Sequence, residues 1–390
     1  MKIRLALLVT IILIIAGLFL QNLSKEPESI EILNKTWEGY KYFFITDDGR
    51  VKRPKDGDTV SEGQAYAMLR AVWMDDKETF DRCYAWTEDN LSRKNNKGDN
   101  LLAWLWKDAK VQDWMPASDA DIDYALSLVF ADSIWKEGPP DYLEGYGVKA
   151  EKILKDILDL ETFKIADGRL FLSPWILEKD ADRILFPVNP SYYSPAHFRV
   201  FHQFTNDPRW IKLADTTYFI LRELSREFDG QEGLGLIPDW CSIDNAGVFH
   251  RLDDKSGDFG WESVRIPFRV MLDYLWFQDK NAKTFFESSG YSQFLKREWR
   301  KRKAIYCEYA YTGKPLKAYE NPLFYSAYYC VLSAAGSPYA DNMLKKTRSY
   351  IEKYKGGWLY IDKDEYYVNS LAWLADGIKI GIIKNIYGDN

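Results

Sequence analysis

The first residue that could carry chemistry is Glu62, in the segment S-E-G-Q at 61–64. Ser61 suits a helix N-cap, and the apolar residues after it recur at helical spacing. An acidic residue in the first turn stabilises a helix through its dipole, so a structural role alone could explain Glu62. Gly63 costs a helix about 1 kcal/mol relative to Ala. We therefore expect another group to approach the backbone closely at this point.

A second acidic group lies in the segment A-S-D-A-D-I-D at 117–123, just before an apolar helical pattern. It places carboxylates at alternating positions, on Asp119, Asp121 and Asp123. Helix capping and the helix dipole explain one or two of them. A third carboxylate so close to the others raises the electrostatic repulsion, which favours a use for it beyond helix stability.

A third acidic position is Glu262, in the segment G-W-E-S-V-R at 260–265. Glu262 and Arg265 are three residues apart and could therefore pair on one face of a helix. Pro267 follows, and a proline there either kinks the helix or marks a late helix start.

These carboxylates have the chemistry that cleavage of a glycosidic bond needs. One carboxylic acid protonates the leaving oxygen, while a second carboxylate attacks directly or activates a water molecule. A third can orient the sugar or tune its neighbours. Acids at helix starts more often serve structure than catalysis, so these positions alone leave both roles open.

The composition restricts the alternatives. The chain has 390 residues, a formal net charge of −6 and no basic block in its body, which argues against nucleic acid as a partner. The sequence has only three histidines and lacks H-E-x-x-H, G-x-S-x-G and Gly-rich phosphate-binding motifs. The 15 Trp and 26 Tyr suit either a hydrophobic core or a cleft in which aromatic rings stack on sugars.

The N-terminal segment predicts export. Lys2 and Arg4 precede an uncharged, mostly aliphatic stretch at 5–20. We expect residues 1–23 to be a signal peptide or an uncleaved membrane anchor, with the body of the protein secreted or facing outward at the cell surface. Residues 24–36 are polar and are expected to form a stalk before the body.

The four cysteines, at positions 83, 241, 307 and 330, are widely spaced. An exported chain can form disulfides, and the sequence does not choose among the three pairings. Cys83 and Cys330 lie in apolar helical patterns, so buried free thiols are at least as well supported.

Helical periodicity recurs from about residue 37 to the C-terminus without a linker, which predicts a single domain over 37–390. An all-α core of this length exceeds the usual size of about 250–300 residues, unless the helices form a ring around an inner layer. Turn residues and short apolar runs predict one hairpin around 167–172 and another around 244–249. The expected helices are 62–74, 77–91, 122–136, 148–160, 192–204, 208–228, 262–278, 280–303, 323–335, 340–354 and 366–377.

A series of short motifs follows the same stretch of chain. They are G-R-V at 49–51, V-S-E-G-Q-A-Y-A-M at 60–68, L-A-W-L-W at 102–106, A-S-D-A-D at 117–121, N-P-S-Y at 189–192, P-D-W at 238–240 and W-E-S-V-R at 261–265. In this order they resemble glycoside hydrolase family 8. That family includes bacterial endoglucanases, xylanases, chitosanases and the cellulase encoded with bacterial cellulose synthases. One motif would be weak, whereas the ordered series is specific.

The resemblance implies an all-α fold, the (α/α)6 barrel, with six inner and six outer helices and a few short strands in the connections. It also implies an inverting endo-glycosidase that acts on a β-linked polysaccharide, such as β-1,4-glucan, xylan, chitosan or an exopolysaccharide, with no metal or organic cofactor. Glu62 matches the general acid of S-E-G-Q. Asp119 matches the first Asp of A-S-D-A-D, which contacts the sugar and helps to position the reacting groups. We expect a monomer.

The chain departs from the family pattern at its third acid. Many members carry Tyr-Asp-Ala where this chain has Trp261-Glu262-Ser263, and that Asp is the usual general base. Glu is longer by one methylene, a shift of about 1.5 Å where a misplacement of about 1 Å can cost 100-fold in rate. We expect Glu262 to serve as the base in a slightly reshaped site. The alternatives are that Asp258 or Asp121 takes over, that the enzyme is slow or altered in substrate, or that the protein only binds polysaccharide.

Further candidates lie close to the motifs. Aromatic residues there are candidate sugar platforms, with core packing as the alternative for half or more of them. Polar residues there could hydrogen-bond the sugar or orient the acids, and Arg265 could equally be a salt-bridge partner of Glu262. The aromatic candidates are Tyr66, Trp104, Trp106, Trp114, Tyr192 and Trp240, and the polar candidates are Asp121, Tyr124 and Arg265.

A general acid must hold a proton near the working pH. A helix N-terminus lowers the pKa of Glu62, whereas Asp119, Glu262 and apolar walls raise it. We expect the influences that raise the pKa of Glu62 to outweigh the helix N-terminus. For inversion, the carboxyls of Glu62 and Glu262 should lie about 6.5–9.5 Å apart, leaving room for a water molecule.

Overall fold

The computed structural model describes residues 26–142, 144–178 and 183–388. Along the chain, helices buried on nearly every side alternate with helices that bury one face. Every residue of α6 (Ser118–Trp135) is buried as far as position 131, whereas α7 (Tyr146–Leu160) buries only the side that packs on α6. A helix buried all round must lie inside the protein, and an amphipathic helix covers it from outside.

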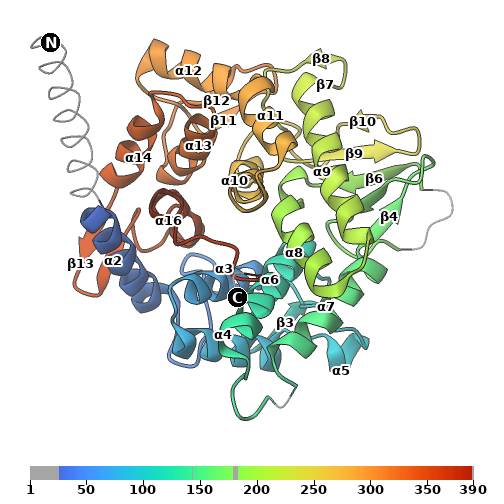
Figure 1. Ribbon diagram of the computed structural model, residues 1–390, viewed down its shortest axis with the longest axis vertical. Helices are drawn as coiled ribbons and strands as arrows, with labels where there is room; N and C mark the ends of the chain where they lie inside the picture. Colours follow the sequence, from blue (N-terminus) through green and yellow to red (C-terminus); the bar gives the residue numbers. More distant parts are fainter. Residues whose placement is uncertain (1–25, 143, 179–182, 389–390) are drawn as a thin grey trace, which may run out of the picture.

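The inner helices form a ring that the outer helices surround (Figure 1). Each inner helix contacts the next one, and α15 closes the ring against α3. This arrangement is the expected (α/α)6 barrel. The inner layer consists of α3 (Ser61–Trp73), α6, α8 (Pro195–Thr205), α10 (Ile266–Phe277), α13 (Pro322–Ala334) and the broken helix formed by α15 (Tyr366–Leu371) and α16 (Leu374–Ile380). The outer layer consists of α2 (Glu26–Phe44), α4 (Lys77–Asn90), α7, α9 (Arg209–Arg226), α11 (Lys280–Ser288) with α12 (Tyr291–Arg302), and α14 (Ala340–Ser349).

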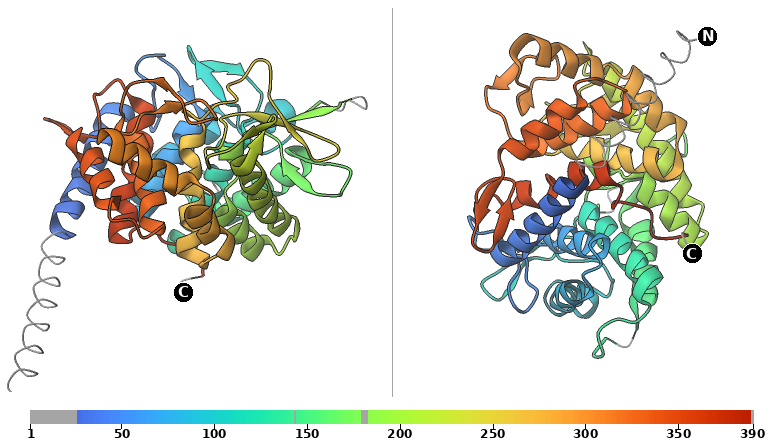
Figure 2. Two further views of the ribbon diagram at one scale, coloured as in Figure 1. Left: turned by 90° about the horizontal axis from the view of Figure 1, so that it is seen from above. Right: turned by 60° about the vertical axis from the view of Figure 1, so that its left-hand side comes forward.

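Short strands in the connections form small antiparallel sheets, and a single helical turn, α5 (Lys94–Lys97), lies among them. The sheet β1-β2-β3 pairs Thr59 with Trp106 and projects from one end of the barrel (Figure 2). Both predicted hairpins are present, as β4–β5 and β9–β10, and β6 pairs Val188 with Cys241 of β9. The strands are β1 (Thr59–Val60), β2 (Leu105–Lys107), β3 (Lys110–Asp113), β4 (Thr162–Lys164), β5 (Leu170–Leu172), β6 (Leu185–Val188), β7 (Glu227–Phe228), β8 (Gln231–Glu232), β9 (Cys241–Asp244), β10 (Phe249–His250), β11 (Glu308–Tyr309), β12 (Pro315–Lys317), β13 (Glu352–Tyr354) and β14 (Gly357–Leu359).

Helix α2 replaces the stalk expected at 24–36. It begins at Glu26 and packs against β14 and α16, so the first and last described helices lie side by side. Leu33, Trp37, Tyr40 and Phe44 are buried and share one face of α2. These apolar residues recur at helical spacing among the charged ones, which makes the segment part of the barrel rather than a spacer.

The predicted signal peptide or anchor at 1–23 lies outside the described residues. Within the described ranges, no helix is both long enough and apolar enough to cross a bilayer.

All four cysteines are free thiols, and all four are buried. This agrees with the apolar patterns around Cys83 and Cys330.

Two long helical patterns are shorter in the structure than in the sequence. The helix expected at 280–303 splits into α11 and α12 at Gly290, whose φ of 96° lies in the left-handed region. The helix expected at 340–354 ends at Ser349, because Glu352–Tyr354 pairs with β14 instead. In the first case a left-handed glycine interrupts the helical periodicity, and in the second a tight hairpin replaces it.

Two further patterns begin later than expected, and each leaves a turn before an inner helix. A 3-10 turn, η1 (Pro190–Tyr192), precedes α8, which starts at Pro195. A second 3-10 turn, η2 (Ser263–Arg265), precedes α10, so Glu262 lies outside the helix. Proline in the first turn of both inner helices suits its fixed φ and missing N–H.

Candidate active site

The cleft lies where the inner helices begin. Glu62 is in the first turn of α3, Asp119 in the first turn of α6, and Glu262 immediately before η2. Tyr192 ends η1 ahead of α8, and Tyr366 is the first residue of α15. All five line one cleft of about 320 Å³, within the range of about 300–1,000 Å³ typical of ligand pockets. The remaining lining residues are Arg53, Lys55, Asp56, Trp261, Arg265, Asp364, Glu365 and Tyr367.

The Arg265 guanidinium joins Asp119 to Glu262. Its Nη1 donates to Asp119 Oδ2 at 2.7 Å, and its Nη2 donates to Glu262 Oε2. Nη1 also donates to the Tyr66 hydroxyl at 3.3 Å, and Nη2 donates to Ser191 Oγ at 2.8 Å. Arg265 is buried, so these charge-assisted bonds form away from bulk water and fix the two carboxylates relative to each other.

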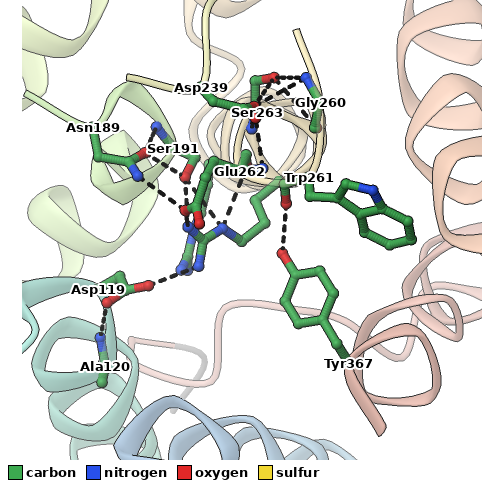
Figure 3. Close-up of polar contacts among 12 residues, drawn as sticks. Asp119, Ala120, Asn189, Ser191, Asp239, Gly260, Trp261, Glu262, Ser263 and Tyr367 are labelled. Atoms are coloured by element: carbon green, nitrogen blue, oxygen red, sulfur yellow. Dashed lines mark hydrogen bonds and ion pairs between the residues drawn. The ribbon is translucent and has the colours of Figure 1, made fainter. Parts of the chain in front are cut away.

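Glu262 is held through both its side chain and its backbone (Figure 3). Asn189 Nδ2 donates to Glu262 Oε2 at 2.9 Å. Asp239 Oδ1 accepts from the backbone N–H groups of Gly260, Glu262 and Ser263 at 3.0, 3.1 and 2.8 Å. The Glu262 side chain is still 34% exposed, so it is fixed in place and open to the cleft.

Asp119 lies at the floor of the cleft. It is almost completely buried, and Ala120 N donates to its Oδ1 at 2.9 Å (Figure 3). Burial raises the pKa of Asp119, and Arg265 opposes that rise. The ion pair with Arg265 therefore offsets part of the penalty for burying this carboxylate.

Glu62 faces the same cleft as a carboxyl that holds its proton. Burial and the neighbouring Asp119 raise the pKa of Glu62 to about 8, although Arg265 and Arg53 act in the opposite direction. Burial and Asp119 thus outweigh the two arginines, and the pKa of Glu62 lies above its usual range, as expected. A carboxyl with this pKa is protonated at neutral pH, as a general acid must be.

The close approach expected at Gly63 comes from Tyr366. A Cβ placed on Gly63 would lie 2.7 Å from the Tyr366 hydroxyl oxygen and 3.2 Å from its ring. Glycine therefore lets α15 pack against α3 beside the cleft. The expected cap is wrong, because Val60 occupies the N-cap position and Ser61 is the first helical residue.

One of the candidate sugar platforms, Tyr192, lines the cleft. The ring of a second candidate, Trp240, meets that of Tyr192 edge to face, with centroids 5.8 Å apart. Trp175, 6.0 Å from Trp240, continues this row of rings. Tyr66 is buried below the cleft, where its hydroxyl accepts from Arg265. Tyr66 is therefore placed to hold Arg265 rather than to stack on a sugar.

The other three tryptophan candidates lie beside the sheet β1-β2-β3, outside the cleft lining. Trp104 Nε1 donates to Asp113 at 2.8 Å. Trp106 packs edge to face against Trp86, with centroids 5.2 Å apart, and Trp114 follows β3. A role for these rings in binding a longer substrate stays a prediction.

Two polar candidates point away from the cleft. Tyr124 is fully buried and donates its hydroxyl proton to Glu88 at 2.6 Å. Asp121 is also fully buried, and its Oδ1 accepts from Leu102 N at 2.9 Å. Both residues tie α6 to its neighbours. The reason is the helical geometry of α6. Asp121 and Tyr124 follow Asp119 by two and five residues, which places them on other faces of the helix.

The alternative bases do not share this cleft. Asp121 is buried beneath it, and Asp258 lies outside its lining, where it accepts from Tyr311 N at 3.0 Å. Among the described residues, no group of three or more His, Cys, Asp or Glu side chains could hold a metal ion.

The cleft also contains residues that were not candidates. The Trp261 ring lies 6.3 Å from that of Tyr367, whose hydroxyl donates to the Trp261 carbonyl at 3.1 Å (Figure 3). Asn189 and Asp239, which hold Glu262, stand in the motifs N-P-S-Y and P-D-W, and that signal could have identified them. Tyr367 comes from the far end of the chain, and nothing in the sequence near it points to the cleft.

Comparison with known proteins identifies the family. The chain matches glycosyl hydrolases family 8 over residues 14–311. Endoglucanase A of Acetivibrio thermocellus is 29% identical over 364 residues, which cover 90% of this chain and 69% of that protein. Endoglucanase 2 of Ruminiclostridium josui is 30% identical over 278 residues, which cover 67% of this chain and 55% of that protein.

Solved structures share the fold. The apo β-1,3-1,4-glucanase of Paenibacillus sp. X4 has a TM-score of 0.75 at 21% identity, over 91% of this chain and 93% of that one. Rex8A of Paenibacillus barcinonensis, complexed with xylose, has a TM-score of 0.74 at 22% identity, over 92% and 93%. At this identity the likeness shows the fold alone, and the sequence match carries the family. The chain belongs to glycosyl hydrolases family 8 and is a glycosidase.

Proposed function

We propose that the protein hydrolyses internal β-1,4 bonds of a glucan with inversion, using Glu62 as the general acid and Glu262 as the general base. One observation carries this proposal. A carboxyl that keeps its proton at neutral pH and a carboxylate ion-paired with Arg265 face one cleft. Acid and base roles require two carboxyls in environments that differ in this way.

The proposed reaction needs only side chains that the cleft contains, together with water. Glu62 gives its proton to the glycosidic oxygen as the bond to the anomeric carbon breaks. A water molecule attacks that carbon from the opposite face of the sugar, and Glu262 takes the proton that the water loses. Asp119 positions the sugar at the cleavage site. Glu62 is left ionised and Glu262 protonated, and proton exchange with solvent restores both.

The contacts of Glu262 support its use as a base in place of a shorter Asp. Asn189 and Arg265 both donate to Glu262 Oε2, and Asp239 anchors the turn below it. A side chain held at its carboxylate and at its backbone can be as well placed as a shorter one, provided that the anchoring groups are matched to its length.

The substrate is proposed from the relatives and from the aromatic walls. Both curated relatives named above are endoglucanases. Aromatic rings of Tyr192, Trp261 and Tyr367 line the cleft and can stack on pyranose rings.

The test combines a substrate panel with matched variants. Release of reducing ends is measured on carboxymethylcellulose, mixed-linkage β-glucan, xylan and chitosan, and the anomer formed first is followed by NMR. We expect hydrolysis of a glucan with the inverted anomer formed first. Glu62→Gln should lower the rate by at least about 100-fold, the size of a general-acid contribution. Glu38→Gln, on the exposed side of α2, is the matched control and should retain full activity.

The rival function is binding without hydrolysis. It is supported if the protein binds one of these polysaccharides and releases no reducing ends from any of them. Release of the retained anomer would exclude Glu262 as the general base of an inverting reaction. The conclusion that the protein is a glycosidase would still stand.

We also propose that residues 1–23 direct export and leave the enzyme secreted or held at the outer face of the cytoplasmic membrane. The charged residues Lys2 and Arg4 ahead of the aliphatic stretch at 5–20 support this proposal. N-terminal sequencing of the mature protein from medium and membrane fractions distinguishes the two forms. Recovery of the full chain from the cytosol alone would contradict both.

A further inference from the structure

A second Asp–Arg pair lies one helical turn below the first. Asp123 follows Asp119 by four residues on α6, and Arg269 follows Arg265 by four residues on the η2–α10 segment. Arg269 Nη2 donates to Asp123 Oδ2 at 2.7 Å, and Nη1 donates to Oδ1. Residues four apart share one face of a helix, so the two pairs connect the same two segments at successive helical turns. We call Asp119–Arg265 the upper rung and Asp123–Arg269 the lower rung.

The lower rung is buried and fully bonded. Asp123 is 1% exposed and Arg269 is 7% exposed. Burial alone would raise the pKa of Asp123, but Arg269 and His197 together hold it below its usual range. Asp123 is therefore a buried anion with a bidentate cationic partner, which is the geometry that fixes position most strongly.

Helix α8 lies between α6 and α10 in the ring and joins this rung through His197 (Figure 1). His197 Nε2 lies 3.1 Å from Asp123 Oδ1, and its Nδ1 lies 2.6 Å from Ser194 Oγ. Burial lowers the pKa of His197, so the ring is neutral and donates one proton to Asp123 while it accepts one from Ser194. One rung thus ties together three inner helices that each lead to the cleft.

The two pairs influence each other electrostatically and share a cavity. Asp123 and Arg269 both act on the electrostatic environment of Asp119. Arg265, Asp123 and Arg269 also line one internal cavity below the cleft, together with Tyr66 and His197. If Arg269 lost its charge, Asp123 would be left as a buried anion without a cationic partner, and Arg265 is a cation that lines the same cavity.

We propose that Asp123 and Arg269 are positioning residues for the hydrolysis proposed above. The lower rung satisfies Asp123, and this leaves Arg265 free to hold Asp119 and Glu262 in their working positions. The inference rests on the proposed function, because its effect on rate acts through Glu262.

The first test removes the lower cation with Arg269→Gln. We expect kcat per folded enzyme to fall by at least about tenfold. Arg265 should turn toward Asp123 and no longer hold Glu262, so the Glu262 carboxylate should shift by a distance of order 1 Å. KM should change less than twofold, because the aromatic walls of the cleft keep their places. Arg269→Lys keeps the charge without the bidentate geometry, and its kcat should lie between those of the wild type and of Arg269→Gln.

The second test removes both charges. In Asp123→Asn/Arg269→Gln no unpaired anion competes for Arg265, so kcat should recover to within about threefold of the wild type. A purely structural rung predicts the reverse, with stability falling further and kcat per folded molecule unaffected in either variant. Folding is checked for each variant by circular dichroism and thermal unfolding.

The outcomes separate this inference from the proposed function. If the wild type hydrolyses glucan and Glu62→Gln does not, the function stands. Arg269→Gln with a wild-type kcat, or a double variant as slow as the single one, would then overturn the rung alone. If Arg269→Gln does not fold, Arg269→Lys decides, and a wild-type kcat in that variant contradicts the inference. A crystal structure of Arg269→Gln gives a readout that does not depend on turnover. In that structure Arg265 must contact Asp123.

Discussion

Glu62 is subject to opposing influences on its proton. The N-terminus of α3 and the cations Arg265 and Arg53 favour the ionised form, whereas burial and Asp119 favour the protonated form. Burial is the largest of these influences, and it raises the pKa to about 8. A position that suits a helix-stabilising anion in the sequence therefore carries a protonated carboxyl at neutral pH in the folded protein.

This shift predicts the alkaline limb of the pH profile. We expect kcat/KM to fall as the pH rises through about 8, because Glu62, the proposed general acid, loses its proton there. Asp119→Asn removes the carboxylate that contributes most to raising the pKa of Glu62 and leaves the opposing Arg265 in place, so the limb should move to lower pH. A limb that does not move would contradict the coupling of these two carboxyls.

The same shift predicts a pH-dependent stability. The carboxyl of an unfolded Glu titrates near pH 4.3, so between about pH 4.3 and 8 the folded protein binds a proton that the unfolded chain releases. The free energy of unfolding should therefore fall as the pH rises through this window. Denaturant unfolding of the wild type and of Glu62→Gln tests this, since the variant should lack that part of the slope.

The length of Glu262 gives a further prediction at the scale of one residue. Glu262→Asp would withdraw the carboxylate by about 1.5 Å from Asn189 and Arg265, and we expect kcat to fall by about 100-fold. Glu38→Asp, an exposed change of the same kind, is the control. A rate equal to the wild type in Glu262→Asp would mean that the family's usual Asp works equally well here, and that these contacts do not position the base.

At the scale of elements, local signals succeed where one segment decides its own structure. The turn at Asp167-Gly168 and the following apolar run form β4–β5 as predicted, because a hairpin depends on its own turn residues. The pattern at 280–303 breaks at Gly290 because Gly290 packs against Leu234 and Gly235, far away in the sequence. The pattern at 340–354 ends early because its last residues pair with β14, which follows after only two residues, so this local hairpin was missed in the sequence.

Helix α2 offers a direct test of its place in the barrel. Leu33 is 2% exposed, and Leu33→Ala should lower the free energy of unfolding by about 2–5 kcal/mol, as expected for truncating a buried leucine. Ile30, on the same helix, is 49% exposed, and Ile30→Ala should change it by no more than about 0.5 kcal/mol. Equal effects in chemical denaturation would mean that α2 does not pack as described.

At the scale of the whole molecule, burial decides the chemistry of the cysteines. All four are free and buried, and burial raises the pKa of Cys83 to about 12. We expect no thiol of the native protein to react quickly with an aromatic disulfide reagent, and all four to react in denaturant without prior reduction. Fewer reactive thiols in the denatured, unreduced protein would reveal a disulfide and contradict the free state.

The sequence by itself determined the succession of helices, the order of the family motifs and the set of three acids, Glu62, Asp119 and Glu262. These features are encoded in local periodicity and in side-chain types, which a chain carries whether or not it is folded. Only the tertiary structure decided that Tyr366 covers Gly63, that Tyr124 is buried, that Arg265 joins Asp119 to Glu262, and that Glu62 keeps its proton. The physical reason is distance along the chain. Arg265 meets Asp119 across 146 positions, and contacts of that range form only when the ring of helices closes.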